Sequence, residues 1–158
     1  MDGKNALLVS GFEHHRHGRL IDAERAYRAV LDQDPHNPDA LHLLGLLARK
    51  AGHFDAAIDF ISRSVAVRPN FVDAVYNLGN ALQTVNRMQE AEEVYRRAIA
   101  LKEDHDWAHL HLGNVLYKTG RFEEAMVECD RAREHRLVQQ LQAQGTDYDT
   151  FVCSLQKG

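Results

Sequence analysis

The stretch Asn77-Leu78-Gly79-Asn80-Ala81-Leu82 lies near the middle of the chain and has the apolar spacing of a helix, yet it carries a glycine inside it. A glycine inside a helix costs about 1 kcal/mol relative to alanine, so it normally has a packing reason. Ala91 and Tyr95 follow one turn apart, and Asn86-Arg87 between the two segments is typical of a tight turn. We therefore predict that residues 72–105 form a helix, a turn and a second helix, with small residues where the helices approach closely.

The same arrangement recurs along the chain at intervals of 34 residues. The mid-helix glycine occurs as Gly11, Gly45, Gly79 and Gly113. The alanine of the second helix recurs as Ala23, Ala57, Ala91 and Ala125, and the turn residue recurs as Gly18, Gly52, Asn86 and Gly120. A fixed period of this length indicates stacked structural repeats.

This pattern resembles the tetratricopeptide repeat, whose signature is Trp-x2-Leu-Gly-x2-Tyr, then Ala-x3-Phe, then Pro. The third copy here reads Val75-x2-Leu78-Gly79-x2-Leu82 with Ala91-x3-Tyr95. The second and fourth copies match in the same way, whereas the first copy is weaker in its first helix and clearer in Ala23-x3-Tyr27 and Pro35. The resemblance implies an all-α fold, an α-solenoid of antiparallel helix hairpins built from four repeats.

The resemblance covers residues 4–137, with repeats at about 4–37, 38–71, 72–105 and 106–137. The expected helices span about 5–17, 20–33, 39–51, 54–67, 72–85, 88–101, 106–119 and 122–135, and Pro38 suits the first turn of a helix. One hairpin cannot bury both of its faces, so the repeats must stack. Stacking is expected to bury a continuous ribbon made of Leu44, Leu47, Ile58, Ile61, Leu78, Leu82, Tyr95, Ile99, Leu112 and Leu116.

The C-terminal segment departs from the repeat. Residues 136–144 continue in a helix-compatible pattern, Gly145 breaks it, and Thr146 can cap a last short helix that carries Tyr148, Phe151, Val152 and Leu155. We expect residues 138–158 to form a capping helix and tail over the last exposed apolar face. In the alternatives, the tail begins a longer segment or pairs with a second chain.

Composition excludes several classes of function. A net charge of −4 argues against a phosphate-binding surface over the whole molecule, so no nucleic-acid partner is expected. Cys129 and Cys153 make no disulfide framework, and Cys129 is expected to be a buried thiol. No basic start with a long apolar run and no 18-residue apolar stretch occurs, so we expect a cytoplasmic chain without membrane insertion.

Catalytic and metal-binding patterns are not evident in the sequence. The ten histidines include His105 and His109 four residues apart, but no third ligand follows at a standard metal spacing. No nucleophile elbow or phosphate-binding loop occurs. We therefore expect no catalytic residues, no metal and no cofactor, and no enzyme activity in this chain alone.

The resemblance also implies where a partner would bind, because the first helices of successive repeats line a concave groove in this family. The first-helix residues on that side grade from apolar in the first two repeats to amide-rich in the last two. The candidate peptide-binding residues are Phe12, His42, Leu43, Leu46, Arg49, Tyr76, Asn77, Asn80, Gln83, Trp107, His111, Asn114, Tyr117 and Lys118. In the alternative, Leu43 and Leu46 pack between repeats and the amides form a solvated helix face.

Two functional hypotheses follow from these residues. In the first, the chain is a protein-interaction scaffold that holds a peptide or helix of another protein in the groove. In the second, it is the N-terminal, substrate-presenting region of a larger bacterial glycosyltransferase- or sulfotransferase-like enzyme, because Asn77 and Asn80 resemble the asparagine-lined groove of O-linked N-acetylglucosamine transferases. Homo-oligomers formed through the ends of the repeat array are a further possibility.

Overall fold

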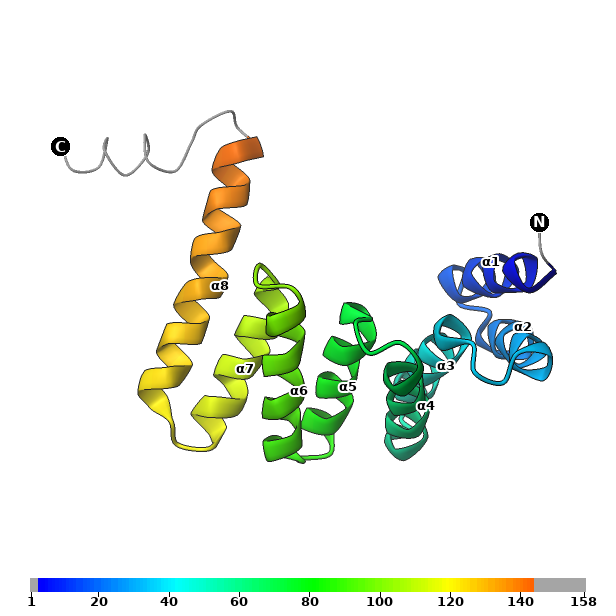
Figure 1. Cartoon of the computed structure of the whole chain (residues 1–158), viewed down its shortest axis with the longest axis horizontal. Helices are drawn as coiled ribbons and strands as arrows, with labels where there is room; N and C mark the ends of the chain where they lie inside the picture. Colours follow the sequence, from blue (N-terminus) through cyan, green and yellow to red (C-terminus); the bar gives the residue numbers. More distant parts are fainter. Residues whose placement is uncertain (1–2, 144–158) are drawn as a thin grey trace.

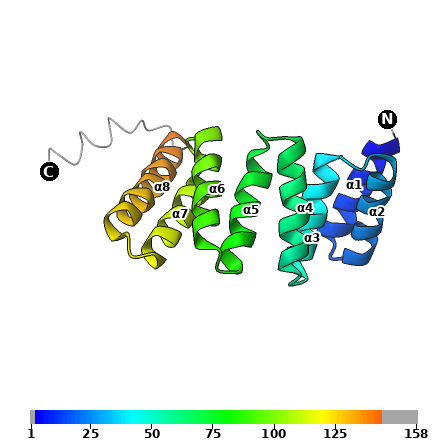
Figure 2. The ribbon, with the colours of Figure 1, turned by 60° about the horizontal axis from the view of Figure 1, so that its bottom comes forward.

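The computed structural model describes residues 3–143 of the chain, and all secondary structure in that range is α-helical. The helices are α1 (Gly3–Arg16), α2 (Leu20–Gln33), α3 (Pro38–Lys50), α4 (Phe54–Val67), α5 (Val72–Thr84), α6 (Met88–Leu101), α7 (Asp106–Lys118) and α8 (Phe122–Ala143). Figure 1 shows them as a curved row from the N-terminus at one end to the C-terminus at the other. Each helix packs on the next, and α5 also contacts α3 and α7. This arrangement is the predicted all-α solenoid of hairpins, and Figure 2 shows its successive layers from a second side.

The turns inside the four hairpins share one backbone conformation. Gly18, Gly52 and Gly120 have φ values of 74°, 81° and 82°, and Asn86 at the equivalent position has φ of 63°. This left-handed region is open to glycine and tolerated by asparagine, while other side chains clash with the backbone there. The 34-residue spacing of these four residues therefore reflects a conformation that every hairpin needs.

The mid-helix glycines lie where the two helices of a hairpin touch. A Cβ atom at Gly79 would lie 2.6 Å from the ring of Tyr95, and one at Gly113 would lie 2.7 Å from Sγ of Cys129. Gly11 and Gly45 are crowded in the same way by Tyr27 and Ile61. The predicted packing reason for these glycines is thereby confirmed.

The core follows the expected ribbon with two differences. Leu44, Leu47, Ile61, Leu78, Leu82, Tyr95, Leu112 and Leu116 are buried. Ile58 and Ile99 also pack against this core, but they are only half-buried. Each directly follows a fully buried alanine, Ala57 or Ala98, and a rotation of about 100° per residue places it at the edge of the packed face.

The helix ends agree with the sequence to within one or two residues, except in α8. Pro38 begins α3, and the side chain of Asn37 accepts a hydrogen bond of 3.0 Å from the backbone of Ala40, which caps the helix. The last helix of the fourth repeat does not end near residue 135 but continues to Ala143, through the segment 136–144 whose pattern is compatible with a helix. The expected short helix over residues 146–155 lies outside the described residues, and the proposed division at residue 137 stays a prediction.

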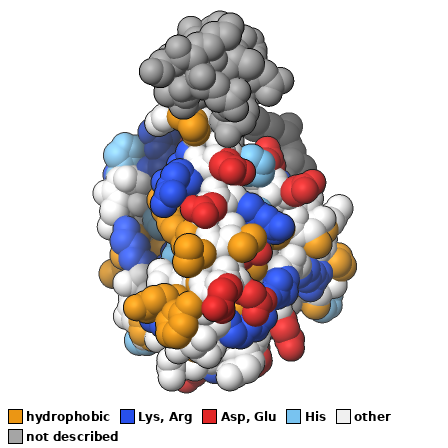
Figure 3. Space-filling view, turned by 90° about the vertical axis from the view of Figure 1, so that its left-hand side faces the viewer, with side chains coloured by type: hydrophobic (Ala, Val, Ile, Leu, Met, Phe, Trp, Pro, Cys, Tyr) orange, Lys and Arg blue, Asp and Glu red, His pale blue; other side chains and the backbone are white. Residues whose placement is uncertain are grey.

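The C-terminal end of the array carries exposed apolar side chains that lie among charged ones (Figure 3). Tyr117, Phe122 and Met126 are 63%, 53% and 67% exposed, and with Leu110 and Cys129 they line a cavity of about 360 Å³. Cys129 is half-buried rather than buried, because no described segment covers this face. The equivalents of Tyr117 and Phe122 in the third repeat are Gln83 and Met88. There the fourth repeat covers the same face, because Gln83 contacts His111 and Met88 is buried.

None of the described helices combines the length and the apolar character that crossing a lipid bilayer requires.

Candidate peptide-binding groove

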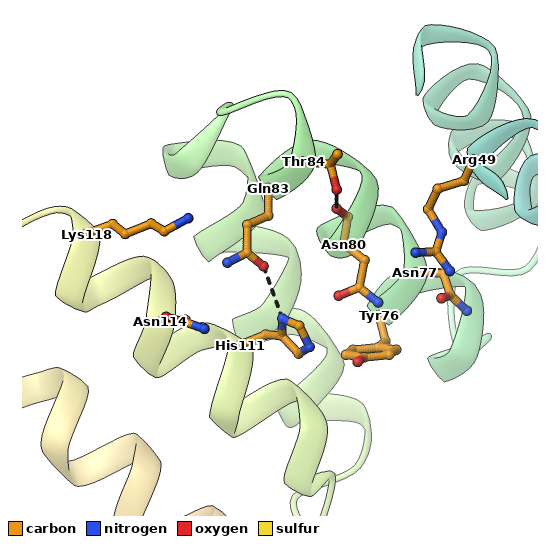
Figure 4. Close-up of a pocket in the computed structure, with 9 residues that line it drawn as sticks. All are labelled: Arg49, Tyr76, Asn77, Asn80, Gln83, Thr84, His111, Asn114 and Lys118. Carbon is orange, nitrogen blue, oxygen red and sulfur yellow. Dashed lines mark hydrogen bonds between the residues drawn. The ribbon is translucent and has the colours of Figure 1, made fainter. Parts of the chain in front are cut away.

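The first helices of the repeats together line two adjoining open cavities. The amide section, of about 670 Å³, lies between α3, α5 and α7 (Figure 4). Its lining residues are Arg49, Tyr76, Asn77, Asn80, Gln83, Thr84, His111, Asn114 and Lys118. The apolar section, of about 640 Å³, is lined by Phe12, His42, Leu43, Leu46, Asp73, Tyr76, Asn77, residues 102 and 104–107, and Gln139. Because both sections share Tyr76 and Asn77, they form one groove.

The structure brings thirteen of the fourteen candidate residues to this groove. The remaining candidate, Tyr117, lies instead on the C-terminal end face, where its ring packs edge-on against Phe122 at 5.3 Å. Tyr117 lies next to Lys118 in the sequence, but the helical rotation of about 100° between them directs it into the neighbouring cavity at the C-terminal end, which shares Asn114 with the amide section. Its role in peptide binding stays a prediction.

The sequence pattern missed the part of the lining that does not come from first helices. Lys102, Asp104 and His105 belong to the segment between α6 and α7, and Gln139 belongs to α8. Helix periodicity describes one face of one helix, so it gives no signal for residues that reach the same cavity from a loop or from a later helix. The extra length of α8 supplies Gln139.

The expected gradient from apolar repeats to amide-rich repeats is only partly observed. Phe12, Leu43 and Leu46 do line the apolar section, but Trp107 of the fourth repeat lies there as well and is 58% exposed. Trp107 and Lys118 are about 16 Å apart along α7, at a rise of 1.5 Å per residue. One helix therefore lines both sections. The change from apolar to amide side chains occurs along α7 itself as well as from one repeat to the next.

Leu43 combines the two roles that the sequence left as alternatives, and Leu46 lines the same section of the groove. Both side chains are half-buried and line the apolar section. Leu43 also packs against the core cluster of the first two repeats, which includes Tyr27 and Leu44. Leu43 therefore stabilises the stacking while it keeps an apolar surface towards the groove.

His42 is a buried support of the groove rather than an exposed contact. Its side chain is only 7% exposed, and its ring lies edge-on to Phe71 at 4.9 Å. Burial lowers the pKa of His42, so the neutral ring can accept a hydrogen bond of 3.1 Å from the amide nitrogen of Asn77. The same amide nitrogen donates to the backbone oxygen of Asp73 at 2.8 Å, which holds Asn77 in place.

Two of the groove amides are held by a tyrosine beneath them. The hydroxyl of Tyr95 lies 2.7 Å from Oδ1 of Asn80 and 2.8 Å from Oε1 of Gln83, and Nδ1 of His111 lies 3.1 Å from the same Gln83 oxygen. Burial raises the pKa of Tyr95, so its hydroxyl keeps its proton and donates. Asn114 differs, since it is exposed and makes no side-chain hydrogen bond within residues 3–143. It has the greatest capacity to bind a partner backbone.

The histidines that suggested a metal pair have other contacts. Nδ1 of His105 accepts a hydrogen bond of 3.1 Å from the backbone of Ala108 and caps α7. The nitrogens of His109, which is buried, lie 2.6 Å from a carboxylate oxygen of Glu128 and 2.9 Å from the backbone oxygen of Glu103. Across the described range, no three histidine, cysteine, aspartate or glutamate side chains are grouped as metal ligands.

Comparison with known proteins agrees with this architecture. The family model described as "Tetratricopeptide repeat" matches residues 14–82 and 82–145. A crystal structure of MamA superposes with a TM-score of 0.82 at 24% sequence identity, covering 87% of this chain and 80% of that one. A second MamA structure gives a TM-score of 0.73 at 20% identity, with 84% and 76% covered. No curated protein is detectably similar in sequence.

An enzyme also contains a similar region. A mutant of the O-GlcNAc transferase of Thermobaculum terrenum superposes with a TM-score of 0.68 at 35% identity. The match covers 72% of this chain but only 22% of that enzyme, so the likeness is confined to a small part of it. The family match, in contrast, extends over most of the residues described here. This chain belongs to the tetratricopeptide repeat family.

Proposed function

We propose that this protein is an interaction scaffold that binds a peptide or helical segment of another protein in the groove. The observation that carries the proposal is the convergence of α1, α3, α5 and α7 on one continuous cavity with exposed apolar and amide side chains. Stacked repeats use concave surfaces of this kind for binding. Buried apolar contacts would supply most of the affinity, and the amides would fix register and direction.

Trp107 and Asn114 offer the sharpest test of this proposal, because both are exposed. Trp107→Ala should weaken binding of a groove peptide about tenfold or more, since it removes a large apolar contact. Asn114→Ala should weaken it less, by about the value of one hydrogen bond, 0.5–1.5 kcal/mol. Neither change should alter the melting temperature measurably, because both side chains face solvent in the free protein.

The measurement is isothermal titration with peptides selected from a random library against the whole chain. Ile21→Ala is the matched control, because Ile21 is 74% exposed on α2 and lies outside the groove. Unchanged affinity in both groove variants would move the binding site off this surface. Leu43→Glu is a poorer probe, because Leu43 also packs on the core.

A second function is favoured by one observation, the 35% identity to part of the O-GlcNAc transferase. In this proposal the chain is the substrate-presenting repeat region of a larger glycosyltransferase- or sulfotransferase-like enzyme. Asn77, Asn80 and Asn114 line the amide section and would hold the acceptor polypeptide. A transferase domain in the same gene or an adjacent one would support this role, and titration with the acceptor peptide would test it.

The other expectations about this chain stay predictions. They comprise the absence of enzyme activity, of cofactors and of nucleic-acid binding, the cytoplasmic location, and self-association through the repeat ends. Sedimentation at several concentrations measures the last of these directly.

A further inference from the structure

We propose that two copies of this chain form a symmetric dimer through their C-terminal end faces, with their α8 helices antiparallel. The C-terminal end face is lined by Leu110, Tyr117, Phe122, Met126 and Cys129. The inference concerns self-association rather than peptide binding, so it goes beyond the proposed function. It follows from the apolar character of this face, from the polar character of the opposite end of the array, and from the charges along α8.

The C-terminal end face exposes large apolar side chains to solvent. Tyr117, Phe122 and Met126 are each more than half exposed, and they line a cavity of about 360 Å³. Within the array the equivalent face is covered, since Met88, which occupies the position of Phe122 in the third repeat, is buried. Exposed apolar patches of this kind are typical of surfaces that another molecule covers.

The opposite end of the array does not match this face. Leu44 and Leu47 belong to the core cluster that also contains Tyr27 of the first repeat, and their positions are apolar in the later repeats too. In α1 the residues at these two positions are Ser10 and Glu13. A copy stacked head to tail would place the carboxylate of Glu13 against apolar side chains, at a cost in desolvation. The C-terminal end face therefore fits a second copy of itself better than it fits the N-terminal end of another chain.

The length of α8 also favours a separate molecule over a further hairpin of the same chain. α2, α4 and α6 end at residues 33, 67 and 101, so the equivalent position in the fourth repeat is residue 135. α8 continues to Ala143 instead, and the eight residues from 135 to 143 add about 12 Å of helix. A helix that followed with a linker of the usual length would start about two turns beyond the place where the first helix of a fifth repeat would begin.

The charges along α8 make this helix complementary to an antiparallel copy of itself. Phe122, Met126, Asp130 and Arg133 are spaced at i, i+4, i+8 and i+11, so they share one face of the helix. With a two-fold axis between Asp130 and Arg133, the aspartate of each copy lies beside the arginine of the other. Met126 then lies over Leu137 of the second copy, and no other charged residue of α8 faces a like charge.

Two simpler reasons for this charge pair are incomplete. The helix dipole favours acidic residues in the first turn and basic residues in the last, but Asp130 and Arg133 lie in the middle of a helix of 22 residues. The two side chains also pair with each other at 3.1 Å. Both are exposed, and an exposed pair contributes little to stability, so each can exchange its partner for one in a second copy.

Sedimentation equilibrium of the whole chain at several concentrations tests the proposal. The expected result is a reversible equilibrium between monomer and dimer without larger species, because two-fold pairing of one face is closed. Met126→Glu should weaken the dimer about tenfold or more, since it places an unpaired charge against an apolar surface. Ile21→Glu is the matched control and should leave the dimer unchanged, because Ile21 is also exposed but lies on α2. Circular dichroism should show the helix content of the parent in both variants.

A charge exchange tests the antiparallel arrangement itself. Asp130→Arg and Arg133→Asp should each weaken the dimer about tenfold, because each places like charges opposite one another twice in a symmetric dimer. The double variant with both substitutions should regain most of the affinity, since opposite charges face each other again. Added salt should reduce the differences among these variants. Loss of affinity in the single variants without recovery in the double variant would contradict the antiparallel pairing.

The same measurements identify the other possible occupants of this face. A chain that stays monomeric at its highest soluble concentration would overturn the proposal. If Phe151→Glu with Leu155→Glu then converts that monomer to a dimer, the C-terminal residues of the chain itself cover the face. Species larger than a dimer would indicate head-to-tail stacking, and a dimer that Met126→Glu leaves intact would form through another surface. Either result would also rule out the proposed dimer, and none of them bears on peptide binding in the groove.

Discussion

Two equivalent tyrosines show how a single residue's environment decides its contribution to stability. Tyr27 and Tyr95 are related by two repeats, are both fully buried, and each pack against the glycine of the preceding helix. The hydroxyl of Tyr95 contacts Asn80 and Gln83, whereas the equivalent positions near Tyr27 hold Phe12 and His15. The hydroxyl of Tyr27 is buried without a hydrogen-bond partner in the described part of the chain, and burial raises its pKa to about 12.

We therefore expect different results from the same substitution. Tyr95→Phe should lower the free energy of unfolding by about 1 kcal/mol, because it removes a hydrogen bond from the buried hydroxyl to a half-buried amide oxygen. Tyr27→Phe should be neutral or slightly stabilising, because it removes a buried hydroxyl that has no acceptor. Urea denaturation of both variants measures the difference. Equal losses would show that the two hydroxyls have equivalent partners.

At the scale of the helices, α7 and α8 are joined by a buried polar contact in addition to apolar packing. His109 of α7 is 2% exposed and lies 2.6 Å from the carboxylate of Glu128 on α8, which is itself held at 3.4 Å by Arg131. The two ring nitrogens of His109 face two oxygen atoms, one in the carboxylate of Glu128 and the other in the backbone of Glu103.

Glu128→Ala should therefore lower the free energy of unfolding by about 1–3 kcal/mol, because it leaves a buried ring nitrogen without its acceptor. Glu124→Ala is the matched control, since Glu124 lies one turn earlier on α8 and is exposed. Thermal melts of the two variants make the comparison. A Glu128→Ala melt that matches that of Glu124→Ala would show that packing alone holds α8.

For the whole molecule, four histidines that are buried or half-buried predict a dependence of stability on pH. Burial lowers the pKa values of His15, His42, His105 and His111 below 6.5, their ordinary value. Nearby Asp73 opposes this shift at His42 and His105 but is the smaller cause. The unfolded chain therefore binds more protons than the folded chain as the pH falls through 6.5, so folding loses stability on acidification.

Melting temperatures measured from pH 8 to pH 5 should be constant at the alkaline end and fall below about pH 6.5, by about 2–4 °C for each kcal/mol lost. His111→Gln should make the fall shallower, because it removes one of the four groups while retaining a polar side chain beside Gln83. A melting temperature that rises on acidification would contradict the prediction.

The sequence by itself determined the fold. In a stacked array each repeat contacts only its neighbours, so the information lies in contacts of short and fixed separation. Gly79 beside Tyr95 and the left-handed turn at Asn86 are such contacts, and their recurrence every 34 residues predicts both the hairpins and their stacking. The resemblance to the family predicted which helices line the groove, and helical spacing predicted most of the residues on that face.

Only the tertiary structure decided how those residues are used. Helical spacing places His42, Asn80 and Asn114 on the same groove-facing side of their helices. In the structure His42 is buried, Asn80 contacts Tyr95 beneath it, and Asn114 is exposed. Gln139 enters the groove from a helix whose length the repeat did not predict. The physical reason is that the path of a long side chain and the closure of a cavity depend on the angles between helices in different repeats, and no single helix encodes them.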